Sequence, residues 1–264
     1  MIKVMKLLIC AGLLVAVSIG CSKSEESRID KCISEIKDKM SNAGTRNAAA
    51  ARLVGIGAPA VPRLIRELKN NDNVRIRYYS CVSLGKIGDS SALDAVTGAL
   101  RDEAPEVRGG ACEAIARLEN EKAIPTLIEM LMDEQTVPRE EAKKALANIV
   151  GNPKETEEDK DNAGVPSISP LIECFQNKNE FLRSEARVAL EQIGPKAVDK
   201  LIDALKDEKG DVVVYVAKTL AAIGEKRALD SIMESAKRFE GAGNEKIHKS
   251  IRGAFDDLKQ KLGS

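Results

Sequence analysis

The sequence predicts an all-α protein, an α–α superhelix of about seven helix pairs. One pattern recurs along most of the 264 residues: an arginine, small residues at +3 and +4 in most copies, a large aliphatic residue at +7 and an aliphatic residue at +10. These four positions share one face of an α-helix. A unit of about 30 residues repeated this often predicts a solenoid. The residues that mark the pattern are Arg46, Arg77, Arg108, Arg139, Arg183 and Val213.

A second helix is expected before each marker helix. Its pattern is a run of aliphatic residues, often next to a proline, found at residues 62–65, 124–128, 170–172 and 198–202. A short polar residue stands six positions before five of the markers. Its side chain can accept a hydrogen bond from the free N–H groups that open the next helix, or reach an arginine of a stacked neighbour. These polar residues are Asn71, Asp102, Asp133, Asn177 and Asp207.

The blocks VRGGACEAIARL, LRSEARVALEQIG and AIPTLIEMLMDE resemble HEAT repeats, especially the short variety of phycobilin-lyase-like proteins. The resemblance covers Thr45 to Leu262. It implies that the arginine helices line a concave face and that Asp or Asn pairs with Arg in a ladder through the stack. The sequence departs from that ladder at Val213, and Asn replaces Asp at Asn71 and Asn177. The implied ladder residues are Arg77, Asp102, Arg108, Asp133, Arg139 and Arg183.

The N-terminus has the order of a secretory signal. Lys3 and Lys6 precede the apolar run LLICAGLLVAVSIG, which is short for a membrane span. Residues 17–21, VSIGC, resemble a bacterial lipobox, which implies acylation of Cys21. We therefore expect a signal peptide at 1–20, a lipidated tether at 21–26, and a lipoprotein anchored in the cell envelope, at the outer membrane or facing the periplasm. The alternatives are an ordinary secretory signal and an uncleaved anchor helix.

The solenoid is expected to fill residues 27–264. Residues 27–40 form its first helix, with Met40 among the buried residues, and residues 245–262 form its last helix. An acidic loop insertion at 151–165 interrupts the repeat. Part of it begins like a calcium-binding loop, but Ala163 and Pro170 stand where that loop needs oxygen ligands. We expect no metal site.

Composition argues against two classes of function. Acidic and basic residues balance at 41 each and there is no tryptophan, which disfavours nucleic-acid binding. The one histidine, His248, is expected on the solvated side of the last helix, so we expect no catalytic residue, no cofactor and no enzyme activity. Stacked helices ~8–10 Å apart exceed the Cα separation of a disulfide, so Cys81 and Cys112 are expected to be core residues.

Two interpretations of function remain. The first is a lipid-anchored scaffold that binds a protein or peptide partner in the cell envelope. The alternative is a lyase-like or enzyme-accessory protein that handles a bound small molecule. The expected partner site uses positions +1, +2 and +5 after the markers, which point away from the buried face, although Tyr78 could instead pack against the next repeat. Its candidate residues are Tyr78, Tyr79, Val82, Val188 and Tyr215.

Overall fold

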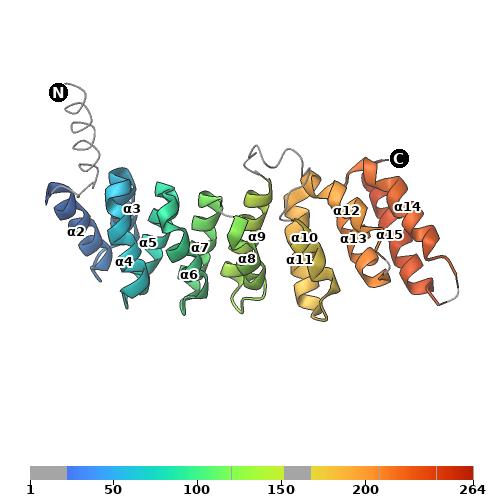
Figure 1. The fold of residues 1–264 in the computed structure, drawn as a ribbon, viewed down its shortest axis with the longest axis horizontal. Helices are drawn as coiled ribbons and strands as arrows, with labels where there is room; N and C mark the ends of the chain where they lie inside the picture. Colours follow the sequence, from blue (N-terminus) through green and yellow to red (C-terminus); the bar gives the residue numbers. More distant parts are fainter. Residues whose placement is uncertain (1–22, 120, 152–167, 208, 242, 264) are drawn as a thin grey trace, which may run out of the picture.

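The computed structural model describes residues 23–119, 121–151, 168–207, 209–241 and 243–263. Within them, seven helix pairs stand side by side in one row, so the predicted fold class is confirmed (Figure 1). The pairs are α2 (Lys23–Lys37) with α3 (Ala43–Ile56), α4 (Val61–Asn70) with α5 (Val74–Ile87), α6 (Leu93–Gly98) with α7 (Pro105–Leu118), α8 (Ile124–Met130) with α9 (Thr136–Gly151), α10 (Ile168–Glu173) with α11 (Glu180–Ile193), α12 (Val198–Ala204) with α13 (Gly210–Ile223), and α14 (Leu229–Arg238) with α15 (Glu245–Lys261).

The helices form two layers. One layer consists of the marker-bearing helices, here called the arginine helices, in which α3, α5, α7, α9, α11 and α13 pack on one another in chain order and α15 closes the row. The other layer consists of α2, α4, α6, α8, α10, α12 and α14. Short 3-10 turns lead into or extend that layer: η1 (Ala58–Ala60), η2 (Ser90–Ala92), η3 (Ala99–Arg101), η4 (Glu121–Ala123), η6 (Cys174–Gln176), η7 (Gly194–Ala197) and η8 (Lys226–Ala228).

The core lies between the two layers and follows the predicted register. Cys81 and Leu84 of α5 and Cys112 of α7 are fully buried. Neighbouring arginine helices approach closely, because a Cβ atom at Gly85 would lie 2.5 Å from the Cα atom of Ala114. The four cysteines of the described part are free and buried, as expected. Burial raises the pKa of the Cys112 thiol to about 12.

The repeat boundaries use ordinary helix-capping chemistry. The side chain of Asn73 accepts a hydrogen bond from the backbone N–H of Arg75 (3.0 Å) at the start of α5. Asn179 does the same for the N–H of Phe181 (2.9 Å) at the start of α11. Helix α5 ends at Ile87 and is capped by Gly88, whose φ of 77° is a left-handed conformation that glycine adopts without strain. Local sequence thus fixes where the helices begin and end.

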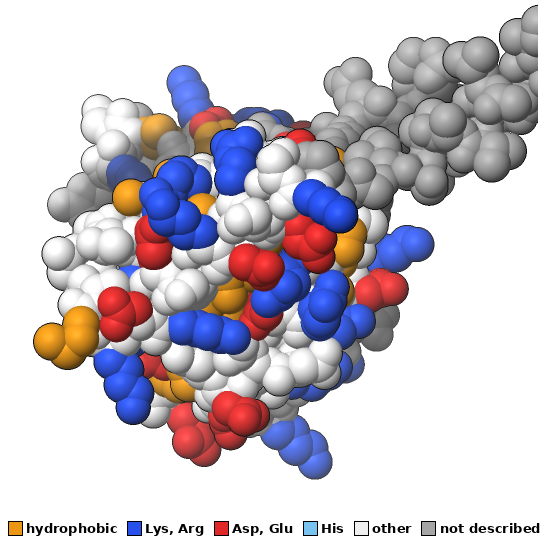
Figure 2. All heavy atoms as spheres, turned by 90° about the vertical axis from the view of Figure 1, so that its left-hand side faces the viewer, with side chains coloured by type: hydrophobic (Ala, Val, Ile, Leu, Met, Phe, Trp, Pro, Cys, Tyr) orange, Lys and Arg blue, Asp and Glu red, His pale blue; other side chains and the backbone are white. Residues whose placement is uncertain are grey.

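The N-terminal end differs from expectation in two details. Helix α2 ends at Lys37, and Met40 is 91% exposed rather than buried. Helix α2 also begins at Lys23, so residues 23–26 of the expected tether are helical. Its buried residues, Ile29, Cys32, Ile33 and Ile36, cover the first repeat. Figure 2 shows the end of the stack with acidic and basic side chains interspersed and small hydrophobic areas, as a terminal repeat in water requires.

At the other end, the expectation that His248 is solvated is wrong. This side chain is half-buried, and its Nδ1 atom lies 2.8 Å from the carbonyl oxygen of Ala236, to which it donates. The hydrogen bond ties α15 to α14. Ile247 lies against Gly210 at the start of α13, where a Cβ atom would meet it at 2.4 Å. His248 is therefore a structural contact of the terminal repeat.

Several sequence-based expectations lie outside the described residues. These include the signal at 1–20, Cys21 and the insertion beyond Gly151. Among the residues that the structure describes, no single helix is long and apolar enough to cross a membrane. The helical segments Ala43–Ile56 and Ala58–Asn70 reach the length and apolar composition of a membrane span only when taken together. The chain bends by 111° between them.

Candidate functional site

Two rungs of an arginine–aspartate ladder join the repeats of the N-terminal half. Arg77 donates to both carboxylate oxygens of Asp102 (2.7 and 2.8 Å), and Arg108 donates likewise to Asp133 (2.5 and 2.8 Å). Each guanidinium also donates to a main-chain carbonyl of its own repeat, that of Asn71 (3.0 Å) for Arg77 and that of Asp102 (2.9 Å) for Arg108. Each arginine therefore joins the start of its own helix to the start of the next arginine helix.

The ladder does not continue into the C-terminal half. Arg139 keeps its bond to the carbonyl of Asp133 (2.6 Å), but its guanidinium lies over the ring of Phe181, 5.4 Å from the centroid. Arg183 likewise lies over the ring of Tyr215, at 5.3 Å. Asp207, the next acidic ladder position, accepts a hydrogen bond from the backbone N–H of Lys209 (2.7 Å). Cation–π contacts therefore replace the rungs here.

A buried lysine joins α9 to α11 where the ladder stops. Lys143 occupies a +4 position, is 3% exposed, and places its Nζ 2.8 Å from Glu140 and 2.8 Å from Glu185. Burial lowers the pKa of Lys143, but the two carboxylates outweigh burial and the pKa is raised. This contact could not be predicted from the sequence, because a lysine at a core position gives no sign of its partner in the next helix pair.

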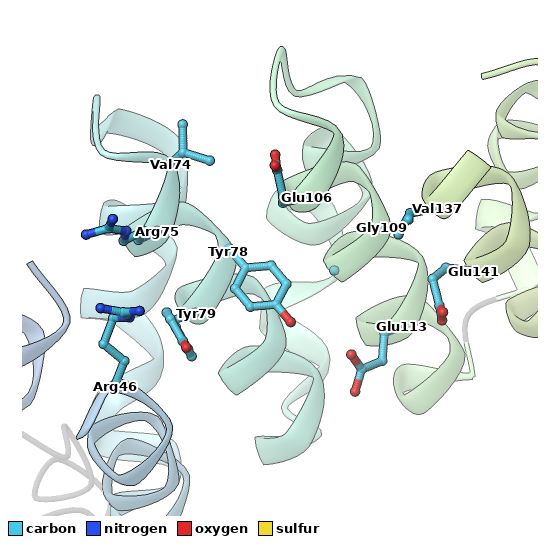
Figure 3. A pocket seen from close by; sticks show the side chains of 11 residues that line it. Arg46, Val74, Arg75, Tyr78, Tyr79, Glu106, Gly109, Glu113, Val137 and Glu141 are labelled. Atoms are coloured by element: carbon cyan, nitrogen blue, oxygen red, sulfur yellow. The ribbon is translucent and has the colours of Figure 1, made fainter. Parts of the chain in front are cut away.

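A hollow on the arginine-helix face lies over α3, α5, α7 and α9 and has a volume of about 710 Å³. We call it the tyrosine groove. Tyr78 and Tyr79 stand on one wall, Gly109 and Gly110 lie opposite, and Val137, which is 63% exposed, lies at the far rim. Figure 3 shows Tyr78 in the middle, with its hydroxyl directed to the side where Glu113 lies.

The two tyrosines form a fixed pair. Their rings meet edge to face, with centroids 5.2 Å apart and an angle of 75°. Tyr79 donates its hydroxyl hydrogen to Asn47 of α3 (3.0 Å). Tyr78 packs against the next repeat, since a Cβ atom at Gly110 would lie 3.1 Å from its ring. Burial raises the pKa of Tyr78, and the Glu113 carboxylate adds to this effect. The pair presents a rigid aromatic wall to the groove.

Charges in the groove are separated by sign. Arg46 and Arg75 lie on the α3–α5 side, whereas Glu106, Glu113 and Glu141 lie on the α7–α9 side (Figure 3). Such a groove can stack a flat apolar body on the tyrosines, pair a carboxylate at one end and accept N–H donors at the other. Sequence analysis missed the −2 register position, which supplies Arg75, Glu106 and Val137 to the groove.

The residues expected to bind a partner do not form one site. Tyr78 and Tyr79 line the groove. Val82 is only 7% exposed, because it packs beside Gly110, and it lines a smaller hollow together with Tyr78 and Tyr79. Val188 is half-buried on α11, and Tyr215 on α13 stacks on Phe175 with centroids 5.4 Å apart. The described residues contain no group of three or more His, Cys, Asp or Glu that could hold a metal ion.

The repeats belong to a known family. The family of HEAT repeats matches residues 61–147 and 165–240, which is more than half of the chain. The chain is therefore a member of the HEAT-repeat family, as the resemblance predicted.

Two curated relatives are more specific. The chain is 32% identical to phycocyanobilin lyase subunit alpha of Nostoc sp. strain PCC 7120 over 127 residues, which is 44% of this chain and 42% of the relative. It is 36% identical to subunit beta of the same organism over 77 residues, which is 29% of this chain and 37% of that subunit. The aligned parts thus span about two fifths of the relatives. Both relatives are subunits of a lyase, which contradicts the prediction that the chain is not an enzyme.

Two solved structures of repeat proteins align with the chain. The complex of CpcE and CpcF of phycocyanin lyase from Nostoc sp. PCC 7120 aligns with a TM-score of 0.48 and 25% identity, over 62% of this chain and 98% of that one. The HEAT-like repeats protein of Thermococcus onnurineus NA1 aligns with a TM-score of 0.47 and 14% identity, over 89% of this chain and 98% of that one.

Proposed function

We propose that the chain is a lyase-like protein that binds an open-chain tetrapyrrole of the phycocyanobilin type in the tyrosine groove and works together with a protein partner. The observation that supports this class of ligand is the similarity to both phycocyanobilin lyase subunits. The HEAT repeats support a protein partner. The partner scaffold without a ligand has less support, because the relatives favour the small-molecule alternative.

The chemistry of the groove suits such a ligand. An open-chain tetrapyrrole combines flat conjugated rings with N–H donors and two propionate groups. Tyr78 and Tyr79 offer an aromatic wall for stacking, and Glu106 and Glu141 offer carboxylate acceptors for the N–H groups. Arg75, exposed on the opposite side, can pair with a propionate. A volume of about 710 Å³ falls within the range of ligand sites.

The test is a titration of the purified chain with phycocyanobilin, followed by the absorbance of the pigment. Binding to the wild-type chain should shift and sharpen the absorbance spectrum of the pigment, and the change should saturate as the titration proceeds. Tyr79→Ala should weaken binding by about tenfold, as loss of a stacking contact of ~1–1.5 kcal/mol implies. Tyr215→Ala is the matched control, because Tyr215 holds the same register position outside the groove. An unchanged pigment spectrum with wild type would refute the proposal.

We also propose that Cys21 is acylated and anchors the chain in the cell envelope. The support is the order of basic residues, apolar run and Gly20–Cys21 in the sequence. Labelling cells with an alkyne fatty acid should tag wild type, and Cys21→Ala should abolish the tag and release the chain from membranes. Membrane retention of Cys21→Ala would contradict the anchor.

A further inference from the structure

A second, smaller hollow lies between α3 and α5 beside the tyrosine groove. Its volume is about 280 Å³, and it shares Tyr78, Tyr79 and Glu113 with the groove. Tyr79 and Asn47, which are joined by a hydrogen bond, both line it. Because the same aromatic pair lines both hollows, a ligand stacked on the pair in the groove has the smaller hollow within reach.

The smaller hollow contains an unpaired polar group. Ser83 is fully buried and lines the hollow, and its hydroxyl oxygen has no hydrogen-bond partner in the described structure. Buried hydroxyls are nearly always hydrogen-bonded, because an unpaired one keeps its desolvation cost without compensation. A bound group that reached the Ser83 hydroxyl would supply the missing partner.

A cation stands at the rim of the same hollow. Lys86 lies one helical turn after Ser83 on α5, is exposed, and forms no ion pair within the described part of the chain. The acidic residue opposite, Glu113, is already paired with Arg117 (3.2 Å). The hollow thus combines a hydroxyl donor inside with an ammonium group at its entrance, which is the combination that binds a carboxylate.

We propose that the hollow between α3 and α5 is a carboxylate subsite, which takes a propionate arm of the tetrapyrrole bound in the tyrosine groove. Lys86 pairs with the carboxylate and Ser83 donates its hydroxyl hydrogen to it. Tyr79 then lies between the stacked rings of the tetrapyrrole and its propionate arm. This inference rests on the proposed function. It adds that the chain recognises a propionate carboxylate of the ligand.

The test compares phycocyanobilin with its dimethyl ester, which keeps the rings and lacks the carboxylate charges. Wild type should bind the ester about tenfold more weakly than the free acid. Lys86→Met should weaken binding of the free acid by a similar factor and leave binding of the ester unchanged. Lys69→Met, a substitution of an exposed lysine on α4 that lines neither hollow, is the control and should behave as wild type.

Ser83→Ala supplies a second measurement. Because its hydroxyl has no partner in the ligand-free chain, the substitution should leave the thermal midpoint unchanged or raise it, while binding of the free acid weakens several-fold. If Lys86→Met binds the free acid as tightly as wild type does, the carboxylate subsite is wrong, while the proposed ligand site in the tyrosine groove is unaffected. If wild type binds neither pigment, the proposed function fails and the subsite with it.

Discussion

The N-terminal and C-terminal halves of the stack join their repeats by different chemistry. In the first half, Arg77 and Arg108 reach across to aspartates of the following repeats in bidentate ion pairs. In the second half, Arg139 and Arg183 occupy the same register and instead lie over aromatic rings. The register therefore specifies where an arginine stands, while its neighbours decide which interaction it makes.

The tyrosines show the same contrast. Tyr79 and Tyr215 both stand two residues after a marker. Tyr79 lines the tyrosine groove, whereas Tyr215 contacts the Phe175 ring and the Arg183 guanidinium and lines a separate hollow of about 600 Å³. The lining of the tyrosine groove is mostly apolar and that of the second hollow is mostly polar, so the tyrosine groove suits flat stacked rings better. The function we propose therefore belongs to the first half of the stack.

The largest effect should come from breaking a ladder rung. Asp133→Ala leaves the Arg108 guanidinium without its carboxylate, and loss of one partner of a buried pair costs ~3–5 kcal/mol. Asp207→Ala, at the corresponding position of a later repeat, removes only an acceptor for one backbone N–H and should cost ~1 kcal/mol. Urea unfolding measures both. Equal losses would mean that the two halves are joined in the same way.

The next effect separates the two tyrosines. Tyr215→Ala removes the ring stacked on Phe175 and under Arg183, and should lower the free energy of unfolding by ~2 kcal/mol. Tyr79→Ala removes a side chain from the wall of an open groove, so it should lower the free energy of unfolding by less than ~1 kcal/mol. Thermal unfolding monitored by circular dichroism distinguishes them. A larger loss for Tyr79→Ala would make that residue structural.

A smaller effect concerns the glycine opposite Tyr78. Gly110→Ala adds a Cβ atom 3.1 Å from the Tyr78 ring, so the ring must shift and narrow the groove. The gain of ~1 kcal/mol in helix propensity offsets part of that strain, so stability should change by less than ~1 kcal/mol while pigment binding weakens. Gly98→Ala meets open space and is the control for propensity alone. Normal pigment binding by Gly110→Ala would contradict the position of the ligand.

The smallest effect is a dependence on pH. Burial raises the pKa of Asp133, but the hydrogen bonds from Arg108 and the Gln135 backbone outweigh it and the pKa is lowered. Stability from this carboxylate is therefore complete above the unfolded value of ~3.9 and is lost as pH falls through the folded pKa. Asp133→Asn should flatten the acid side of the stability curve. An unchanged slope would mean that the ion pair does not control it.

The fold was predictable because it depends on local periodicity. The marker register alone places Leu84 and Ile115 in the core, where both are fully buried. Helix ends were less predictable. Helix α2 stops before Met40 because the side chain of Asp38 accepts the backbone N–H of Met40 (2.9 Å) and supports a turn. A single hydrogen bond of this kind competes with a helical pattern that continues in the sequence.

The groove was only partly predictable. The register predicted that Tyr78 and Tyr79 belong to a binding site. The exposure of a side chain, however, also depends on the residues of the neighbouring helix that face it. Val82 is buried beside Gly110 of the next helix pair, and the buried Lys143 pairs with Glu185 of the next helix pair. These pairings join residues 28 and 42 positions apart, and neither partner carries a local signal for the other.

The most direct test of the ligand site is a crystal structure of the chain with phycocyanobilin bound. The account predicts electron density for the rings in the tyrosine groove, stacked on Tyr79, with one propionate between Ser83 and Lys86. Density for the pigment beside Tyr215 and Lys218, in the second half of the stack, would contradict the assignment of the ligand site to the first half.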